Sequence, residues 1–224
     1  MKDKNIKKQL KSAGYAGIAS LVLFIVWSIL TIFMEYLSII LYDKEISTVL
    51  YAIITIILAV SVIYFFKGFV LIGKKLKNQF LVANSYIFII FVVIYSAYLI
   101  IGGGIFPSCE NLEKIENIPE NSFETKYYCW EDDFNIELLP IEFWIKSVIM
   151  LILIWSFGII NIFFGIVIYK LKDEFGNIAK SAGILHIIAG ILSMLIYYEI
   201  AVFLMLFSTI LDIIILFRAS EKFK

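Results

Sequence analysis

The sequence predicts an all-α, polytopic transmembrane bundle of about six helices. The first observation is composition: the 224 residues are 62% hydrophobic and 17% charged, whereas a soluble domain has about 25% charged residues. The second is that long uncharged stretches recur, each reaching the roughly 20 residues that a membrane-spanning helix needs. The third is that basic residues gather between alternate stretches. Together they exclude a soluble globular enzyme and a disordered tail, and the net charge of zero excludes a nucleic-acid partner.

Uncharged runs define the first four spans. They lie between Lys11 and Glu35, Glu45 and Lys67, Lys77 and Glu110, and Lys146 and Lys170. Within hydrocarbon a helix satisfies all its backbone hydrogen bonds internally, whereas the alternation of a barrel strand is absent here. We therefore predict spans near 13–40, 47–72, 80–102 and 144–169.

The last apolar stretch is predicted to form two further spans. Residues 181–217 carry only two acidic side chains, Glu199 and Asp212, and this length is too great for one span. We place helices near 178–197 and 200–218, with a turn at 197–199. A single span would put the basic C-terminus on the opposite side from the other basic clusters.

The lysines orient the six spans. The N-terminus, the turns after the second and fourth spans, and the C-terminus hold most of the basic residues, whereas the intervening loops hold few. Because cytoplasmic loops carry an excess of Lys and Arg, we predict a multi-pass protein of the cell membrane with both termini in the cytoplasm. The clustered residues are Lys2, Lys4, Lys7, Lys8, Lys11, Lys67, Lys74, Lys75, Lys77, Lys170, Lys172, Lys180, Arg218, Lys222 and Lys224.

One loop, residues 103–141, differs sharply from the rest of the chain. It contains all three prolines, both cysteines and a dense set of acidic residues. Cysteines confined to one extracytoplasmic loop predict a disulfide between Cys109 and Cys129, with a pair of free thiols as the alternative. Clustered carboxylates at 131–133 could hold a hard cation, but the spacing of an EF-hand is absent, and a solvated acidic loop is the simpler reading. No metal site and no cofactor are predicted.

Polar residues at a shared depth in the spans are the candidate functional site. Counted from the basic flanks, four of them lie about 10 Å along their helices and a fifth slightly deeper. Such groups face the bundle interior and find partners, so we predict a polar layer with a Lys67–Asp212 ion pair at its centre. The layer could be an ion or proton site or interhelical glue, and Lys67 could simply snorkel. Its members are Lys67, Asn84, Asn161, His186 and Asp212.

Two further patterns concern packing. Small residues open the first and fifth spans, where Ala13/Gly17 and Ala179/Gly183 form small-xxx-small pairs, and we expect these two spans to pack closely, within or between subunits. Short strings also recur: 75–80 resembles 170–175, and 11–14 matches 180–183. They suggest three parallel helical-hairpin repeats, with chance recurrence as the alternative.

The turn Tyr-Lys-Leu-Lys-Asp-Glu-Phe-Gly at 169–176, followed by the glycine-rich segment 182–190, resembles an uncharacterised family of small polytopic membrane proteins found mainly in archaea. This resemblance covers the C-terminal third. It implies a polytopic membrane protein with no assigned activity. Heavy use of Ile and Lys, with Arg218 as the sole arginine, suits a prokaryote with an AT-rich genome.

Motif content separates the possible functions. The chain has one histidine and lacks H-E-x-x-H, G-x-S-x-G, Walker A and Cys-x-x-Cys patterns. We therefore expect a non-enzymatic integral membrane protein, with a small ion, proton or solute carrier using the polar layer as the alternative. The predicted partners are the lipid bilayer and either a second copy of the chain or another membrane protein.

Overall fold

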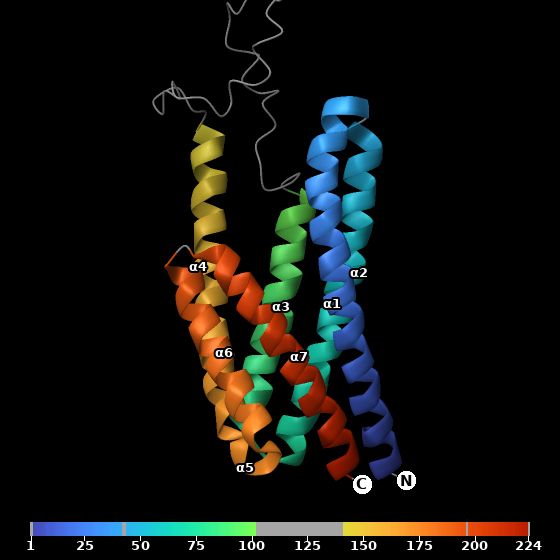
Figure 1. Ribbon diagram of the computed structural model, residues 1–224, viewed down its shortest axis with the longest axis vertical. Coiled ribbons are helices and arrows are strands. Elements are labelled where there is room, and N and C mark those ends of the chain that lie inside the picture. Colours follow the sequence, from blue (N-terminus) through green and yellow to red (C-terminus); the bar gives the residue numbers. More distant parts are fainter. Residues whose placement is uncertain (1, 42–43, 102–140, 196, 224) are drawn as a thin grey trace, which may run out of the picture.

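The computed structural model describes residues 2–41, 44–101, 141–195 and 197–223 (Figure 1). The described part consists of α-helices joined by short turns, without strands, and confirms the predicted all-α bundle. The predicted disulfide between Cys109 and Cys129 falls in residues 102–140, outside the described part of the chain. The helices are α1 (Lys2–Leu41), α2 (Lys44–Lys75), α3 (Gln79–Ile101), α4 (Ile141–Lys170), α5 (Lys172–Phe175), α6 (Asn177–Met194) and α7 (Tyr198–Lys222).

Six of these helices are long and apolar enough to cross a membrane, which makes the chain a multi-pass integral membrane protein. Each predicted span falls on one of them. The last apolar stretch does form two helices, because α6 ends at Met194 and α7 begins at Tyr198. The candidate spans within the helices are Asn5–Ile29, Tyr51–Lys75, Gln79–Ile100, Ser147–Lys170, Asn177–Met194 and Ile200–Lys222.

The six long helices form a closed ring. Each helix contacts the next one in the order α1, α2, α3, α4, α6 and α7, and α7 contacts α1, which closes the ring. Neighbouring helices alternate in direction, and α7 crosses the bundle obliquely to reach α1 (Figure 1). Isoleucine and phenylalanine side chains such as Ile90, Phe163 and Ile200 are exposed on the outside. A surface of this kind is suited to a lipid bilayer.

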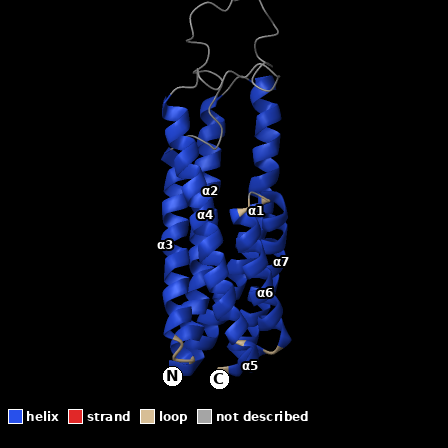
Figure 2. Cartoon of the chain, turned by 90° about the vertical axis from the view of Figure 1, so that its left-hand side faces the viewer, coloured by secondary structure: helices blue, strands red, loops and turns tan. Residues whose placement is uncertain are grey.

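Both described ends of the chain lie at the same end of the bundle as α5 (Figures 1 and 2). We call this the basic end, because it also carries the lysines that close α2 and α4. The turn between α6 and α7 lies well short of the far ends of α1, α2 and α4 (Figure 1). The six helices therefore all run side by side in the half of the bundle nearer the basic end.

The recurring lysine-rich strings differ in local structure. In the first, Lys77 adopts a left-handed φ of 54° and the Asn78 side chain caps α3 by accepting a hydrogen bond from the Leu81 amide. In the second, residues 172–175 form the short helix α5. Phe80 is 75% exposed, whereas Phe175 is buried. The three-hairpin repeat therefore stays a prediction.

Candidate functional site

The inward face of α6 is built from small residues and one large one. At helical spacing, residues three and four apart share a face. On α6 that buried face consists of alanine, glycine and serine, and His186 is the exception at its middle. Its members are Ala179, Ala182, Gly183, His186, Ala189, Gly190 and Ser193.

Glycines on α4 and α6 bring these two helices into backbone contact on either side of His186. A Cβ atom built on Gly183 would lie 2.6 Å from the Gly165 carbonyl oxygen, and one on Gly190 would lie 2.5 Å from that of Gly158. Both glycine pairs are seven residues apart along their helices, so they lie on one face. Close packing of the fifth span was predicted; the structure assigns its partner as α4.

The first span also packs closely, on different neighbours. A Cβ atom on Gly17 would meet the side chains of Phe65 and Ile213, and one on Gly14 would meet Phe217. These contacts hold α1 against α2 and α7. Spans one and five therefore each pack tightly, and α7 lies between them in the ring.

His186 links three helices through its two ring nitrogens. Nδ1 lies 3.1 Å from Oδ1 of Asn161 on α4, and Nε2 lies 2.8 Å from Oδ2 of Asp212 on α7. All three side chains are buried: Asp212 is 1% exposed and His186 is 5% exposed. We call these three residues the buried triad. It joins the helix pair α4–α6 to α7 in the middle of the membrane-spanning region.

The hydrogen-bond pattern assigns one proton of the triad. The Asn161 amide nitrogen donates to the Phe157 carbonyl, at 2.9 Å, which leaves Oδ1 of Asn161 to face His186. Because Oδ1 can only accept, His186 Nδ1 carries a hydrogen and donates it. The short contact between Nε2 and Asp212 then also requires a proton, since two lone pairs would repel. That proton is shared as imidazolium and carboxylate or as imidazole and carboxylic acid, and both forms are neutral as a pair.

One polar atom of the triad is left without a partner. Oδ1 of Asp212 is fully buried and accepts no hydrogen bond within the described residues. An unsatisfied buried acceptor costs about 1–3 kcal/mol, and more when charged. Any group that donates to this oxygen would therefore be stabilised at this place.

The structure brings together three of the five residues predicted for the polar layer. The predicted Lys67–Asp212 ion pair is wrong: Asp212 pairs with His186, and Lys67 is exposed with its Nζ 4.6 Å from the centroid of the Tyr64 ring. Gly68, the next residue on α2, faces Ala13 and Leu216 in the interior. Successive residues are about 100° apart around a helix, so the Lys67 side chain points in a different direction from these two neighbours.

Asn84 is buried but does not join the triad. Its amide nitrogen donates to the carbonyl of Phe80, one turn earlier on the same helix. Serines at similar depth do likewise, as Ser85 does to the Leu81 carbonyl. The hydrogen bonds described for Asn84 and Ser85 are thus made within their own helix.

Phenylalanine rings close the interior on the basic side of the triad. Phe66 stacks on Phe88 with ring centroids 4.4 Å apart, and Phe164 meets the Phe66 ring edge-on. Phe164 also packs edge-on against the imidazole of His186, at 5.1 Å between centroids. With Phe69, which is fully buried, these rings form an aromatic cluster beside the triad, and Phe66 and Phe88 of this cluster also line the cavity described next.

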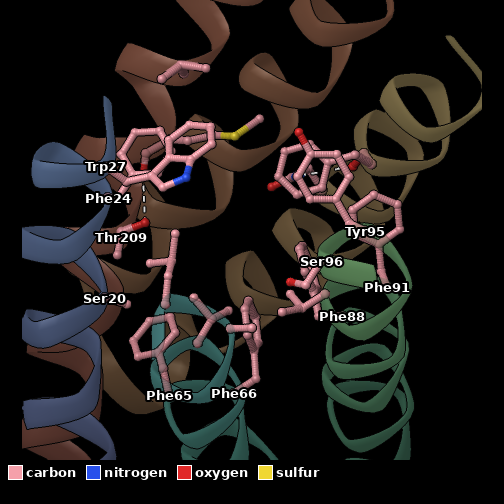
Figure 3. Close-up of a pocket in the computed structure, with 18 of the residues that line it drawn as sticks. Ser20, Phe24, Trp27, Phe65, Phe66, Phe88, Phe91, Tyr95, Ser96 and Thr209 are labelled. Carbon is pink, nitrogen blue, oxygen red and sulfur yellow. Dashed lines mark hydrogen bonds between the residues drawn. The ribbon is translucent and has the colours of Figure 1, made fainter. Parts of the chain in front are cut away.

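On the other side of the triad lies a cavity of about 280 Å³ lined by residues of all six spans. One water needs about 10–15 Å³, so this space holds a molecule of several heavy atoms. Its walls are aromatic and aliphatic, and Figure 3 shows the rings of Trp27, Phe65 and Tyr95 around it. Asn161, His186 and Asp212 are among its lining residues, so the triad forms the polar end of an apolar chamber.

Sequence reasoning missed this cavity. The available signal was the aromatic residues that face it at helical spacing, such as Phe88, Phe91 and Tyr95 on α3 and Phe24 and Trp27 on α1. The same residues, however, suit a packed core or a membrane interface equally well. Composition alone could not tell a chamber from a filled interior.

A resident metal would need more ligands than the triad offers. His186 and Asp212 could each supply one, but the described residues contain no group of three or more His, Cys, Asp or Glu side chains placed to hold an ion. The arrangement is suited instead to binding a group that donates a hydrogen bond.

Comparison of the chain with protein-family models, with curated proteins and with solved structures found no match.

Proposed function

We propose that this integral membrane protein is a small, non-enzymatic solute carrier that holds a largely apolar molecule in the cavity. The observation that carries this proposal is the cavity itself, which all six spans line and which ends at the buried triad. Binding sites for small molecules are typically concave, mostly apolar and fitted with a few placed polar groups. The cavity meets this description, and it lies within the membrane-spanning region, between helices that run antiparallel to their neighbours.

The bonding of His186 supports a non-enzymatic role. A histidine that serves as general base needs a ring nitrogen within reach of the substrate's proton. Here Nδ1 is taken by Asn161 and Nε2 by Asp212. Both ring nitrogens of His186 thus already have hydrogen-bond partners within the protein.

The neutral alcohol 4-phenylbutan-1-ol, a small apolar probe, tests the proposed chamber. Its binding is measured by calorimetry on the protein in phosphatidylcholine nanodiscs, with empty nanodiscs as the blank. The cavity variant Ala59→Phe is compared with Ala97→Phe, which adds the same ring to the exposed face of α3. We expect the wild type and Ala97→Phe to bind equally and Ala59→Phe to lose at least about tenfold in affinity. Equal binding by all three proteins would overturn the proposal.

We also propose that the basic end faces the cytoplasm of the cell membrane. The lysines in the last turns of α2 and α4 lie at the same end as both described termini (Figure 1), and the positive-inside bias favours the cytoplasm for that end. Tags on the two termini should be inaccessible to reagents outside intact cells. Labelling of either tag from outside would contradict this orientation.

A further inference from the structure

The polar end of the cavity contains an acceptor that lacks a donor. Asp212 lines the cavity, is 1% exposed, and leaves Oδ1 with no hydrogen-bond partner. In either placement of the proton shared with His186, Oδ1 remains an acceptor, as a carboxylate oxygen or as the carbonyl of the acid. A hydrogen-bond donor on a bound molecule would satisfy this oxygen.

The number of protons on the triad decides which charge a molecule bound beside it can carry. With the shared proton in place, His186 and Asp212 together are neutral. Without it, the Nε2 lone pair of a neutral imidazole faces a carboxylate, and this repulsive pair carries one negative charge that a bound cation would offset. One monovalent cation arriving as that proton leaves keeps the buried site neutral, which matters because uncompensated charge is costly at membrane depth.

The walls of the cavity are suited to a cation and not to an anion. Aromatic ring faces attract cations through their quadrupoles, and Phe66 and Phe88, which line the cavity, contact the Phe164 ring that packs against His186. No lysine or arginine is among the described residues that line the cavity, and the titratable groups there are Tyr95, His186 and Asp212. On the helices packed around the triad, α2 carries Lys67, which points outward, and α4 presents the neutral amide of Asn161.

The cavity is also elongated. Along α7 its lining runs from Asp212 back to Val202, and along α2 from Phe65 back to Thr55. Each interval is ten residues, which corresponds to about 15 Å of helix. A molecule that fills it has a long apolar or aromatic body with its polar group at the triad end.

We propose that the cavity binds an organic monocation, an amine with an elongated apolar body, in exchange for the proton that His186 shares with Asp212. This inference rests on the proposed function and names the class of solute. The protonated amine donates an N–H to Oδ1 of Asp212, while the shared proton passes to water. One positive charge enters the site and one leaves it, and no covalent bond of the solute changes.

The test compares two probes with the same body. 4-Phenylbutylamine carries an ammonium where 4-phenylbutan-1-ol carries a hydroxyl, and neutral phosphatidylcholine nanodiscs avoid attraction of the amine to lipid head groups. Calorimetry in two buffers of different ionisation enthalpy gives the affinity and the number of protons released. We expect the amine to bind about 10- to 100-fold more tightly and to release about one proton, while the alcohol releases none.

Asp212→Asn tests the anchor, with Glu221→Gln as the matched control because Glu221 is exposed near the end of the same helix. We expect Asp212→Asn to abolish the preference for the amine and the proton release while alcohol binding changes less than about threefold. Glu221→Gln should behave as the wild type. If Asp212→Asn does not fold, the amine preference and proton release of the wild type decide the matter alone.

The outcomes separate this inference from the proposed function. Equal binding of amine and alcohol without proton release, with Ala59→Phe still defective, would overturn the cation exchange and leave the neutral-solute chamber in place. Binding of neither probe to the wild type would overturn both. Amine preference that persists in Asp212→Asn would also contradict the inference, because another group would then anchor the cation.

Discussion

The two halves of the six-helix ring have different interiors. Toward the basic end, the contact between Gly165 and Gly183 holds α4 on α6, and stacked phenylalanine rings fill the centre. Toward the other end, Phe24 and Trp27 of α1 and Phe91 and Tyr95 of α3 line a cavity. The buried triad lies at the boundary between them.

This difference shows how side-chain size shapes a membrane protein. Lipid offers little hydrophobic drive for helix association, so close packing depends on small residues that let backbones touch. Gly158, Gly165, Gly183 and Gly190 supply such contacts on either side of His186. On the cavity side, the rings of Phe24, Trp27 and Phe91 line the space that remains between the helices.

The largest expected effect is the loss of the side chain that joins the halves. His186→Leu would leave Asp212 buried without its partner, and breaking a buried pair costs about 3–5 kcal/mol. We expect the free energy of unfolding in detergent micelles to fall accordingly. The double variant His186→Leu/Asp212→Leu, which leaves no charge unpaired, should recover most of the loss. Wild-type stability in the single variant would show that the triad does not hold the helices together.

A smaller effect is expected from Gly183→Ala in the close-packed half. The added Cβ would meet the backbone of α4, including the Tyr169 nitrogen at 2.5 Å, which cannot move aside as a flexible side chain could. Overpacking of this kind costs about 1–3 kcal/mol. Thermal unfolding of this variant is compared with that of Ser181→Ala, an exposed site on the same helix. Equal melting temperatures would mean that α4 and α6 are further apart than described.

An effect of opposite sign is expected in the hollow half. The hydroxyl of Thr55 lines the cavity and is buried without a hydrogen-bond partner in the described structure. Thr55→Val removes this unsatisfied group at nearly constant shape, so stability should rise by about 1 kcal/mol or stay unchanged. Thr209→Val, which removes a hydroxyl bonded to the Met205 carbonyl, serves as the comparison and should not be stabilising. A clear loss in Thr55→Val would show that Thr55 has a partner.

The smallest effect is expected outside both interiors. Lys67 is exposed and contacts only the Tyr64 ring among the interactions described for it, so Lys67→Met should change the unfolding free energy by at most about 0.5–1 kcal/mol. A loss as large as that of His186→Leu would favour the ion pair with Asp212 that the structure does not show.

The fold was predictable because charge and hydropathy act along the chain. Uncharged stretches flanked by lysines predicted all six helices, including the break between α6 and α7, for which no glycine or proline gave a signal. The depth of polar residues in the membrane could also be predicted from their distance to the basic flanks, and it placed Asn161, His186 and Asp212 at similar levels.

The partners within the site were not predictable, because depth does not say which way a side chain points. Lys67 and Asp212 lie at similar depth, yet Lys67 is on the outward face of α2. The ring order that places α7 beside α6 and α1 is a tertiary property, and so is the separation of helices that opens the cavity. The glycine spacing on α4 and α6 was the overlooked local signal for the tightest contact.

The central claim, that His186 bridges Asn161 and Asp212 and shares a proton with Asp212, has a direct spectroscopic test. The chain contains a single histidine, so nitrogen NMR of ¹⁵N-histidine-labelled protein in lipid reports this ring without assignment. We predict a protonated Nδ1 and an Nε2 whose proton lies in a strong hydrogen bond that Asp212→Asn removes. A neutral ring that lacks the proton on Nδ1, or a spectrum unchanged in Asp212→Asn, would contradict the account.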